Sequence, residues 1–295
     1  MPASTPTAAK RARPLDLPGR AGKVAAGVLT MFTVSLDVDA PGVAEVVGDL
    51  RPGGPDLILL LHGWQRTSAD WDPLLPELEG GDAILRIDLP GFGRTPEPAI
   101  ALGSAGYAEA VASAVGKLAS GEGFERIYAV GHSFGGRVAI QMAARSGGIL
   151  AGAVLAGTPV LKQQPARKPP LLYGLVRNGV RRGILPPAVL DRARRRYGSA
   201  DYNNANGVMR EVLVKVVNES YLEELAACTV PVELVAGELD TAAPAWQAAA
   251  AAEAAPTAEA AVVAGAGHML PLSHPAEIAA ALARVRARSG GLGRG

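Results

Sequence analysis

The chain has 295 residues, which is enough for one or two domains with a sizeable hydrophobic core. Hydrophobic residues make up 48% of it and charged residues 19%, a balance typical of a globular protein and not of a disordered one. The net charge of +1 excludes a protein whose whole surface attracts nucleic acid or an acidic membrane. The one cysteine, Cys228, excludes an internal disulfide and makes a thiolate metal site unexpected.

Both ends of the chain are expected to lie outside the folded part. Residues 1–30 are rich in Pro, Ala and basic side chains without an amphipathic period, so we predict a disordered extension there and a flexible tail at 289–295. An apolar stretch at 24–32 resembles the core of a signal peptide, but acidic residues soon follow and a good cleavage site is missing, so we expect a cytoplasmic protein. No apolar run reaches the roughly 18 to 20 residues that cross a bilayer, so stable membrane insertion is not expected.

From residue 31 onward, apolar runs typical of strands alternate with segments typical of helices. The run Asp-Leu-Ile-Leu-Leu-Leu at 56–61 is apolar enough for a strand that is buried on both faces. Strands are predicted at 31–38, 42–49, 56–61, 83–88, 127–130, 150–156, 232–236 and 260–264. Helices are predicted at 70–78, 104–120, 136–145, 242–254 and 275–288. This alternation predicts right-handed crossovers and a doubly wound, mostly parallel α/β sheet of about eight strands.

The alternation stops between residues 159 and 227, where three helical pieces are predicted at 171–180, 187–197 and 208–225. We therefore expect a helical cap at 159–227, inserted between two parts of one core domain at 31–158 and 228–288.

The predicted cap is basic. From Lys162 to Lys215 there are 12 Lys or Arg and 3 Asp or Glu, a local charge of 12 − 3 = +9, which leaves 1 − 9 = −8 for the remainder. The favoured interpretation is a solvated, Arg-rich helix face, because Arg192 and the run 194–196 are too dense for one face to point inward. The alternative is a surface that attracts an anionic acyl substrate, a phosphorylated carrier or an acidic membrane. Nucleic acid is not an expected partner, because no recognition motif or interleaved aromatic residue accompanies the charge.

A Gly-x-Ser-x-Gly motif marks the first candidate for chemistry. Gly131-His-Ser-Phe-Gly135 directly follows the predicted strand at 127–130 and directly precedes a predicted helix. Glycines at these places permit a tight turn that exposes the hydroxyl of Ser133 at the carboxyl edge of the sheet. A phosphate-binding loop is a poorer interpretation, because neither a Gly-Lys-Ser/Thr nor a Gly-x-Gly-x-x-Gly spacing is present.

A serine hydroxyl needs a base, and that base needs a partner that sets its tautomer. His268 follows the last predicted strand and Asp240 follows the strand before it, so Ser133, Asp240 and His268 all lie in loops at strand carboxyl ends. Alone, His268 would be an ordinary loop histidine and Asp240 a helix cap. Together, in the order Ser, acid, His, they predict a catalytic triad, with Glu238 as the alternative acid.

The negative charge of a tetrahedral intermediate needs N–H donors that are already in place. We predict the backbone amides of Phe134, which follows the nucleophile, and of Trp64, in the loop after the strand at 56–61. His62 and His132 are expected to support these two loops. The apolar stripe at 208–217 is most simply a contact of the cap with the core. The candidates for the substrate pocket are His62, Phe92, His132, Met209, Leu213 and Met269.

These motifs resemble the α/β-hydrolase superfamily over about residues 33–288. The resemblance rests on Leu-Leu-His-Gly-Trp at 60–64, Asp-Leu-Pro-Gly-Phe-Gly-Arg-Thr at 88–95, Gly-His-Ser-Phe-Gly-Gly at 131–136, Gly-Glu-Leu-Asp at 237–240, and Gly-His at 267–268 with His-Pro at 274–275. It implies a single sheet with a helical cap, and neither a metal nor an organic cofactor. Epoxide hydrolases and haloalkane dehalogenases of this superfamily use an Asp nucleophile, whereas this chain has Ser133.

The resemblance and the triad together predict a serine hydrolase. The expected substrate is a carboxylic ester or thioester of a small or medium acyl group, cleaved through an acyl-enzyme. Alternatives on the same triad are hydrolysis of a carbon–carbon bond, a lactonase and a haloperoxidase-like perhydrolase. An alternative of another class is a non-catalytic ligand-binding protein on this scaffold, which the intact triad disfavours.

Overall fold

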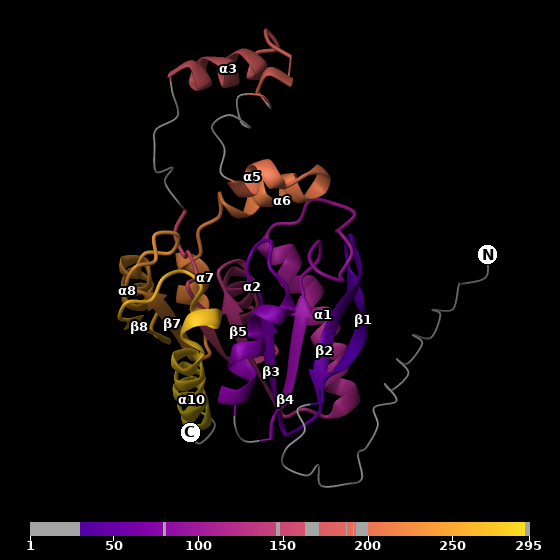
Figure 1. Cartoon of the computed structure of the whole chain (residues 1–295), viewed down its shortest axis with the longest axis vertical. Coiled ribbons are helices and arrows are strands. Elements are labelled where there is room, and N and C mark those ends of the chain that lie inside the picture. Colours follow the sequence, from indigo (N-terminus) through magenta and orange to yellow (C-terminus); the bar gives the residue numbers. More distant parts are fainter. Residues whose placement is uncertain are drawn as a thin grey trace, which may run out of the picture.

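The computed structural model describes residues 30–78, 81–145, 148–162, 171–186, 188–190, 192 and 200–292. The extension predicted at 1–30 falls outside these ranges except for residue 30. The flexible tail predicted at 289–295 is wrong for 289–292, which belong to the last helix. It contains one sheet of eight strands in the order β1-β2-β4-β3-β5-β6-β7-β8 (Figure 1). The strands are β1 (Phe32–Ala40), β2 (Val43–Arg51), β3 (Asp56–Leu61), β4 (Ala83–Asp88), β5 (Arg126–His132), β6 (Leu150–Ala156), β7 (Val232–Gly237) and β8 (Ala258–Val263). The predicted fold is confirmed.

The sheet is parallel except at one side. β1 pairs with β2 and β2 with β4 in antiparallel registers, while every other neighbouring pair is parallel. All six residues of β3 are buried, because the parallel part has helices on both faces. The carboxyl ends of β3 to β8 therefore lie along one edge, where the loops with the candidate residues begin.

Helices cover both faces of the sheet and form two apolar cores. One core contains α1 (Ser104–Glu122), α2 (Phe134–Ala143) and α8 (Ala245–Ala254). The other contains the 3-10 helix η1 (Ser68–Glu77), α9 (Leu270–Ser273) and α10 (Pro275–Leu292). This double cover explains why β3 and β7 are buried along their whole length, whereas β1 at the edge of the sheet alternates buried and exposed residues.

Three predicted helices differ from the observed ones, one for a local reason and two where distant residues make contact. The segment predicted as a helix at 70–78 is the 3-10 helix η1, which contains two prolines that lack the N–H of a regular α-helix. The helix predicted at 208–225 is interrupted, because the N–H of Tyr221 donates to the carbonyl of Val160 at 2.9 Å. The last helix continues past 288 to Leu292, and the Ser289 hydroxyl is 2.8 Å from the Tyr128 hydroxyl.

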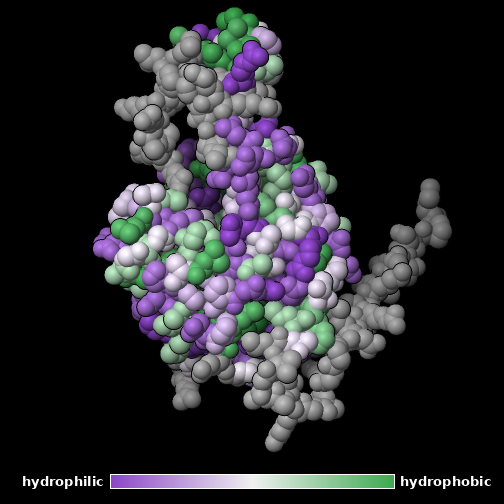
Figure 2. Space-filling model, viewed as in Figure 1, coloured by the Kyte–Doolittle hydropathy of each residue, from purple (hydrophilic) through white to green (hydrophobic). Residues whose placement is uncertain are grey.

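The chain between β6 and β7 contains four described helices: α3 (Leu171–Arg181), α5 (Ala200–Asn204), α6 (Gly207–Val216) and α7 (Leu222–Ala227). Figure 1 shows α5 and α6 above the sheet and α3 farther out. On the face in Figure 2, hydrophobic and hydrophilic residues lie side by side on α3, at the top of the view.

About a third of the basic segment from Lys162 to Lys215 is outside the described ranges. The predicted helix at 187–197 falls largely there, and so do the arginines at 194–196, whereas Arg192 is exposed. Within the described ranges, no helix is both long enough and apolar enough to span a membrane.

Candidate active site

Ser133 occupies a strained turn between β5 and α2. Its φ of 49° and ψ of −106° lie in a region that residues with a side chain rarely adopt. Its N–H donates to the carbonyl of Ala156 at 3.0 Å, and the residue is partly exposed. A Cβ atom at Gly131 would lie 2.5 Å from the carbonyl oxygen of Gly135, so glycine is required for the two sides of the turn to meet. The turn has the geometry that the motif predicts for an exposed nucleophile.

Asp240 and His268 form a hydrogen-bonded pair at the same edge of the sheet. The Oδ2 atom of Asp240 accepts a hydrogen bond from Nδ1 of His268 at 2.8 Å. The Oδ1 atom accepts from the amides of Ala242 and Ala243 at 2.8 and 2.9 Å. Burial raises the pKa of the Asp240 carboxyl, but the bonds from His268 and the two amides outweigh it and lower the pKa below its usual value. An ionised Asp240 keeps the proton of His268 on Nδ1 and leaves the Nε2 lone pair as a base.

His132 connects the nucleophile turn to the loop of His268. Its Nε2 donates to the carbonyl of His268 at 2.9 Å, and the two rings are 5.0 Å apart. Burial, and then repulsion from His268, lower the pKa of His132 to about 4, so it is neutral at pH 7. The residue before Ser133 thus contacts His268 directly.

The end of β6 also approaches the pair. Gly157 has a φ of +52°, and a Cβ atom there would lie 3.3 Å from Oδ2 of Asp240 and 3.4 Å from Nδ1 of His268. Sequence reasoning missed this glycine. The signal was its place directly after an apolar strand, as for the other site loops.

The loop after β3 packs against the nucleophile turn. The ring of Trp64 contacts Phe134 edge to face, with centroids 5.5 Å apart, and Phe92 in the same way at 5.0 Å. A Cβ atom at Gly135 would clash with the carbonyl oxygen of Leu61, so glycine permits this close approach. The backbone of Phe134 begins α2, where the positive end of the helix dipole favours an anion. The two predicted oxyanion residues therefore come from segments in contact.

The imidazole of His62 is buried and makes hydrogen bonds to both the loop after β3 and the segment after β4. Its side chain is 0% exposed, its Nδ1 lies 2.7 Å from the carbonyl of Gly63, and its Nε2 accepts the N–H of Leu89 at 2.9 Å. Because Nε2 is an acceptor, the ring carries its hydrogen on Nδ1 and donates it to Gly63. Burial lowers the pKa of His62, which favours this neutral form.

The other pocket candidates lie mostly below the surface. Met269 is partly exposed beside His268, whereas Phe92, Met209 and Leu213 are 8%, 6% and 6% exposed. Met209 comes from α6 and touches Gly91, with its sulfur 3.8 Å from the Tyr107 hydroxyl. α6 therefore contacts the core beside the site.

The alternative acid has a different partner. The Oε2 atom of Glu238 accepts the N–H of Gly265 at 2.8 Å, and Glu238 is exposed. Among the residues that the structure describes, no group of three or more His, Cys, Asp or Glu side chains is arranged to hold a metal ion.

Several known proteins are similar to this chain. A fluoroacetate dehalogenase from Burkholderia sp. is 35% identical over 109 residues, which cover 37% of this chain and 34% of that protein. A pimeloyl-(acyl-carrier protein) methyl ester esterase from Aeromonas hydrophila is 37% identical over 95 residues, 30% of this chain and 32% of that protein. The matched stretches thus span about a third of these relatives.

Structural similarity extends over most of the chain. A thermophilic esterase from Thermogutta terrifontis matches with a TM-score of 0.63 and 21% identity, over 88% of this chain and 99% of that one. At this identity the likeness shows the fold alone. The sequence also matches the alpha/beta hydrolase family over residues 58–281, which is more than half of its length. With the sheet order and the loops described above, this match shows that the chain belongs to the alpha/beta hydrolase family.

Proposed function

We propose that this chain is a serine hydrolase that cleaves a carboxylic ester or thioester of a small or medium acyl group through an acyl-enzyme. The observation that carries the proposal is the 2.8 Å hydrogen bond between Nδ1 of His268 and Oδ2 of Asp240, next to the strained turn of Ser133. A buried carboxylate, a histidine whose Nε2 has no hydrogen-bond partner among the described residues, and a partly exposed serine are the parts that nucleophilic acyl transfer needs.

In the proposed reaction, Nε2 of His268 takes the proton of Ser133 as its oxygen attacks the acyl carbon. Asp240 stabilises the imidazolium that forms, and the amides of Phe134 and Trp64 donate to the oxyanion. His268 returns the proton to the leaving alcohol or thiol, and an acyl ester on Ser133 remains. Water then attacks this ester with His268 as base, which releases the carboxylic acid and restores the hydroxyl of Ser133.

The nucleophile favours acyl transfer over the displacement that the dehalogenase relative's name implies. Displacement of a halide by Ser133 would leave an alkyl ether on the protein, and water at a triad does not cleave an ether. A carboxylate nucleophile would leave an ester instead, which water cleaves. The resemblance of esterases to this chain is the better guide to its chemistry.

We further propose that residues 159–227 form a cap over the site, with α6 as its fixed part. The guanidinium of Arg137, one turn after Ser133 on α2, donates to the carbonyl of Val216 at 2.8 Å, and Met209 packs on Gly91. The first contact joins the insertion to α2, which begins next to Ser133, and the second joins it to the loop after β4.

Replacing Ser133 by alanine tests the proposal. The variant is expected to lose kcat by several orders of magnitude and to lose labelling by a fluorophosphonate probe, because both need the activated hydroxyl. Purified protein is assayed on a panel of esters, thioesters, lactones and vinylogous 1,5-diketones, which separates ester cleavage from the chemistries closest to it. Full activity of the alanine variant on the preferred substrate would refute the assignment.

A further inference from the structure

The loop that carries Trp64 is held at both ends by two consecutive residues. At its start, the N–H of Leu89 donates to Nε2 of His62 at 2.9 Å. At its end, Oδ1 of Asp88 accepts the N–H of Ser68 at 2.7 Å. The dipeptide Asp88–Leu89, at the carboxyl end of β4, therefore contacts both ends of the loop at 62–68.

The backbone of this loop is strained between the two attachments. Gln65, the residue after Trp64, has a φ of 54°, in the left-handed region that residues other than glycine seldom adopt. Such a conformation costs about 1–3 kcal/mol and persists only where the surrounding structure holds it. Release of either end would let the loop relax and change the direction of the Trp64 amide.

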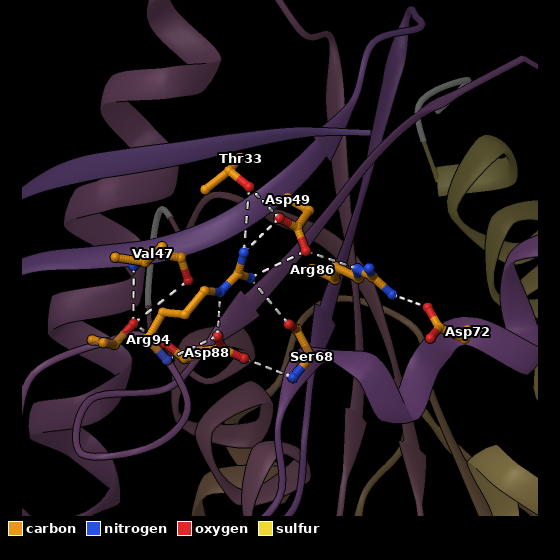
Figure 3. A network of polar contacts seen from close by, with 9 residues as sticks. Thr33, Val47, Asp49, Ser68, Asp72, Arg86, Asp88 and Arg94 are labelled. Carbon is orange, nitrogen blue, oxygen red and sulfur yellow. Dashed lines mark hydrogen bonds and ion pairs between the residues drawn. The ribbon is translucent and has the colours of Figure 1, made fainter. Parts of the chain in front are cut away.

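Arg94 holds Asp88 in the orientation in which its carboxylate accepts the N–H of Ser68 (Figure 3). The Oδ2 atom of Asp88 accepts from Nε of Arg94 at 2.8 Å and from its backbone N–H at 3.1 Å. The outer nitrogens of the guanidinium donate to the two oxygens of Asp49 at 2.7 and 3.1 Å. One of them also lies 3.3 Å from the hydroxyl of Ser68. Charged hydrogen bonds of this kind are strong and directional, so the buried carboxylate of Asp88 has one orientation.

A second contact runs from the same segment to the loop. Phe92, two residues before Arg94, packs edge to face on Trp64 and on His62, with centroids 5.0 and 5.6 Å apart. The segment itself is closed, because the Thr95 hydroxyl donates to the carbonyl of Asp88 at 2.5 Å. A shift of Arg94 would thus be transmitted to Trp64 through both polar and aromatic contacts.

We propose that Arg94 is a positioning residue that fixes the Trp64 amide for oxyanion stabilisation. The inference rests on the proposed function, since it concerns a donor of that reaction. An oxyanion donor acts at about 2.7–3.1 Å, and a displacement of about 1 Å can cost about 100-fold in rate. Loss of Arg94 is therefore expected to weaken the transition state and to leave binding of the ground state nearly unchanged.

The chain offers a matched control in Arg86. Its Nε also donates to Asp49, at 3.2 Å, and its guanidinium forms an ion pair with Asp72 at the surface. Both arginines therefore neutralise the same carboxylate, but the bonds that reach Asp88 and Ser68 belong to Arg94. The Arg86 variant therefore measures how much kcat falls when Asp49 loses one ion pair and the hydrogen bonds to Asp88 and Ser68 are kept.

The test compares Arg94→Met, Arg94→Lys and Arg86→Met on the esters that the wild type cleaves. Arg94→Met is expected to lower kcat about tenfold or more on every ester, while KM stays within about twofold of the wild type. Arg94→Lys is expected to recover part of the lost kcat. The kcat of Arg86→Met is expected to stay within about twofold of the wild type. Equal losses of kcat in the two methionine variants, or a change in KM alone, would overturn the proposal. If Arg94→Met does not fold, Arg94→Lys and Asp49→Asn replace it under the same criteria.

Amide hydrogen exchange separates this proposal from the proposed function. Peptides that cover 62–68 are expected to exchange at least about tenfold faster in Arg94→Met than in Arg86→Met, whether or not the protein is an esterase. If the amide exchange of 62–68 is unchanged in Arg94→Met, the proposed role of Arg94 is overturned even if Ser133→Ala is inactive. Full activity of Ser133→Ala overturns the proposed function, and the exchange data still decide whether Arg94 holds the loop. Faster exchange with unchanged kcat would show that the loop does not position a catalytic donor.

Discussion

Replacing Asp240 by asparagine removes one charge from the site and keeps the size of the side chain. The carboxylate is 0% exposed, so water cannot take the place of its hydrogen bonds. The N–H groups of Ala242 and Ala243 will retain the oxygen of the new amide at the Oδ1 position. Its NH₂ group must then face Nδ1 of His268, which has to become an acceptor. The proton of the imidazole moves to Nε2, and His268 can no longer accept the proton of Ser133.

The expected loss follows from this tautomer. An Asp-to-Asn change in a serine-hydrolase triad lowers kcat by about 10⁴-fold, which at about 1.36 kcal/mol per factor of ten is about 5 kcal/mol of activation free energy. The assay is kcat on the best ester of the panel at neutral pH, with the folded state checked by thermal unfolding. KM is expected to change little, because the pocket is intact.

Glu238→Gln is the matched control, because this neighbouring acid bonds to the amide of Gly265. It is expected to keep kcat within about twofold of the wild type. A loss of less than tenfold in Asp240→Asn, or an equal loss in Glu238→Gln, would refute the assignment of Asp240 as the partner of His268.

Three further changes test packing and ionisation. Because the pKa of His132 is lowered to about 4, the unfolded chain binds more protons than the folded one between pH 4 and 6.5. The free energy of unfolding of the wild type should therefore fall by about 2 kcal/mol from pH 7 to 5, and that of His132→Gln should fall less, as measured by denaturant titrations. An equal dependence of this free energy on pH in the two proteins would contradict the prediction. Gly135→Ala should lower the free energy of unfolding by at least about 2 kcal/mol, because the new Cβ atom would clash with the carbonyl of Leu61. Gly116→Ala is the control, since its Cβ atom meets no described atom within 4 Å, and it should raise the same free energy by about 0.5–1 kcal/mol. The opposite order would be evidence against the close approach of Gly135 to Leu61. Met209→Ala should cost about 2–4 kcal/mol and broaden the acyl chain lengths accepted, and an unchanged chain-length preference would argue against a pocket role.

The sequence by itself determined the class of fold and the residues that carry the proposed chemistry. β3 is apolar along its whole length because both of its faces are buried, and such a run can be recognised from the local composition alone. The motif around Ser133 predicts a tight turn because its glycines and its place between strand and helix are local features. Asp240 and His268 could be chosen because parallel strands bring their carboxyl ends to one edge, wherever those strands lie in the sheet.

Local patterns were less reliable where distant contacts compete with them. A single helix is predicted at 208–225, but the bond from Tyr221 to Val160, sixty-one residues away, interrupts it. The 3-10 form of η1 has a local cause instead, since two prolines lie within an otherwise helical pattern.

Only the tertiary structure decided how the site is supported. No periodicity indicates that His132 donates to the backbone of His268, that Gln65 adopts a left-handed conformation, or that Asp88 and Arg94 grip the loop of Trp64. These contacts join segments that are far apart in the chain, and their partners are chosen by the packing of strands and loops in space. The residues of the proposed triad could therefore be chosen from local motifs, whereas the contacts that hold the loop of Trp64 appear only when β2, β3 and β4 come together in the sheet.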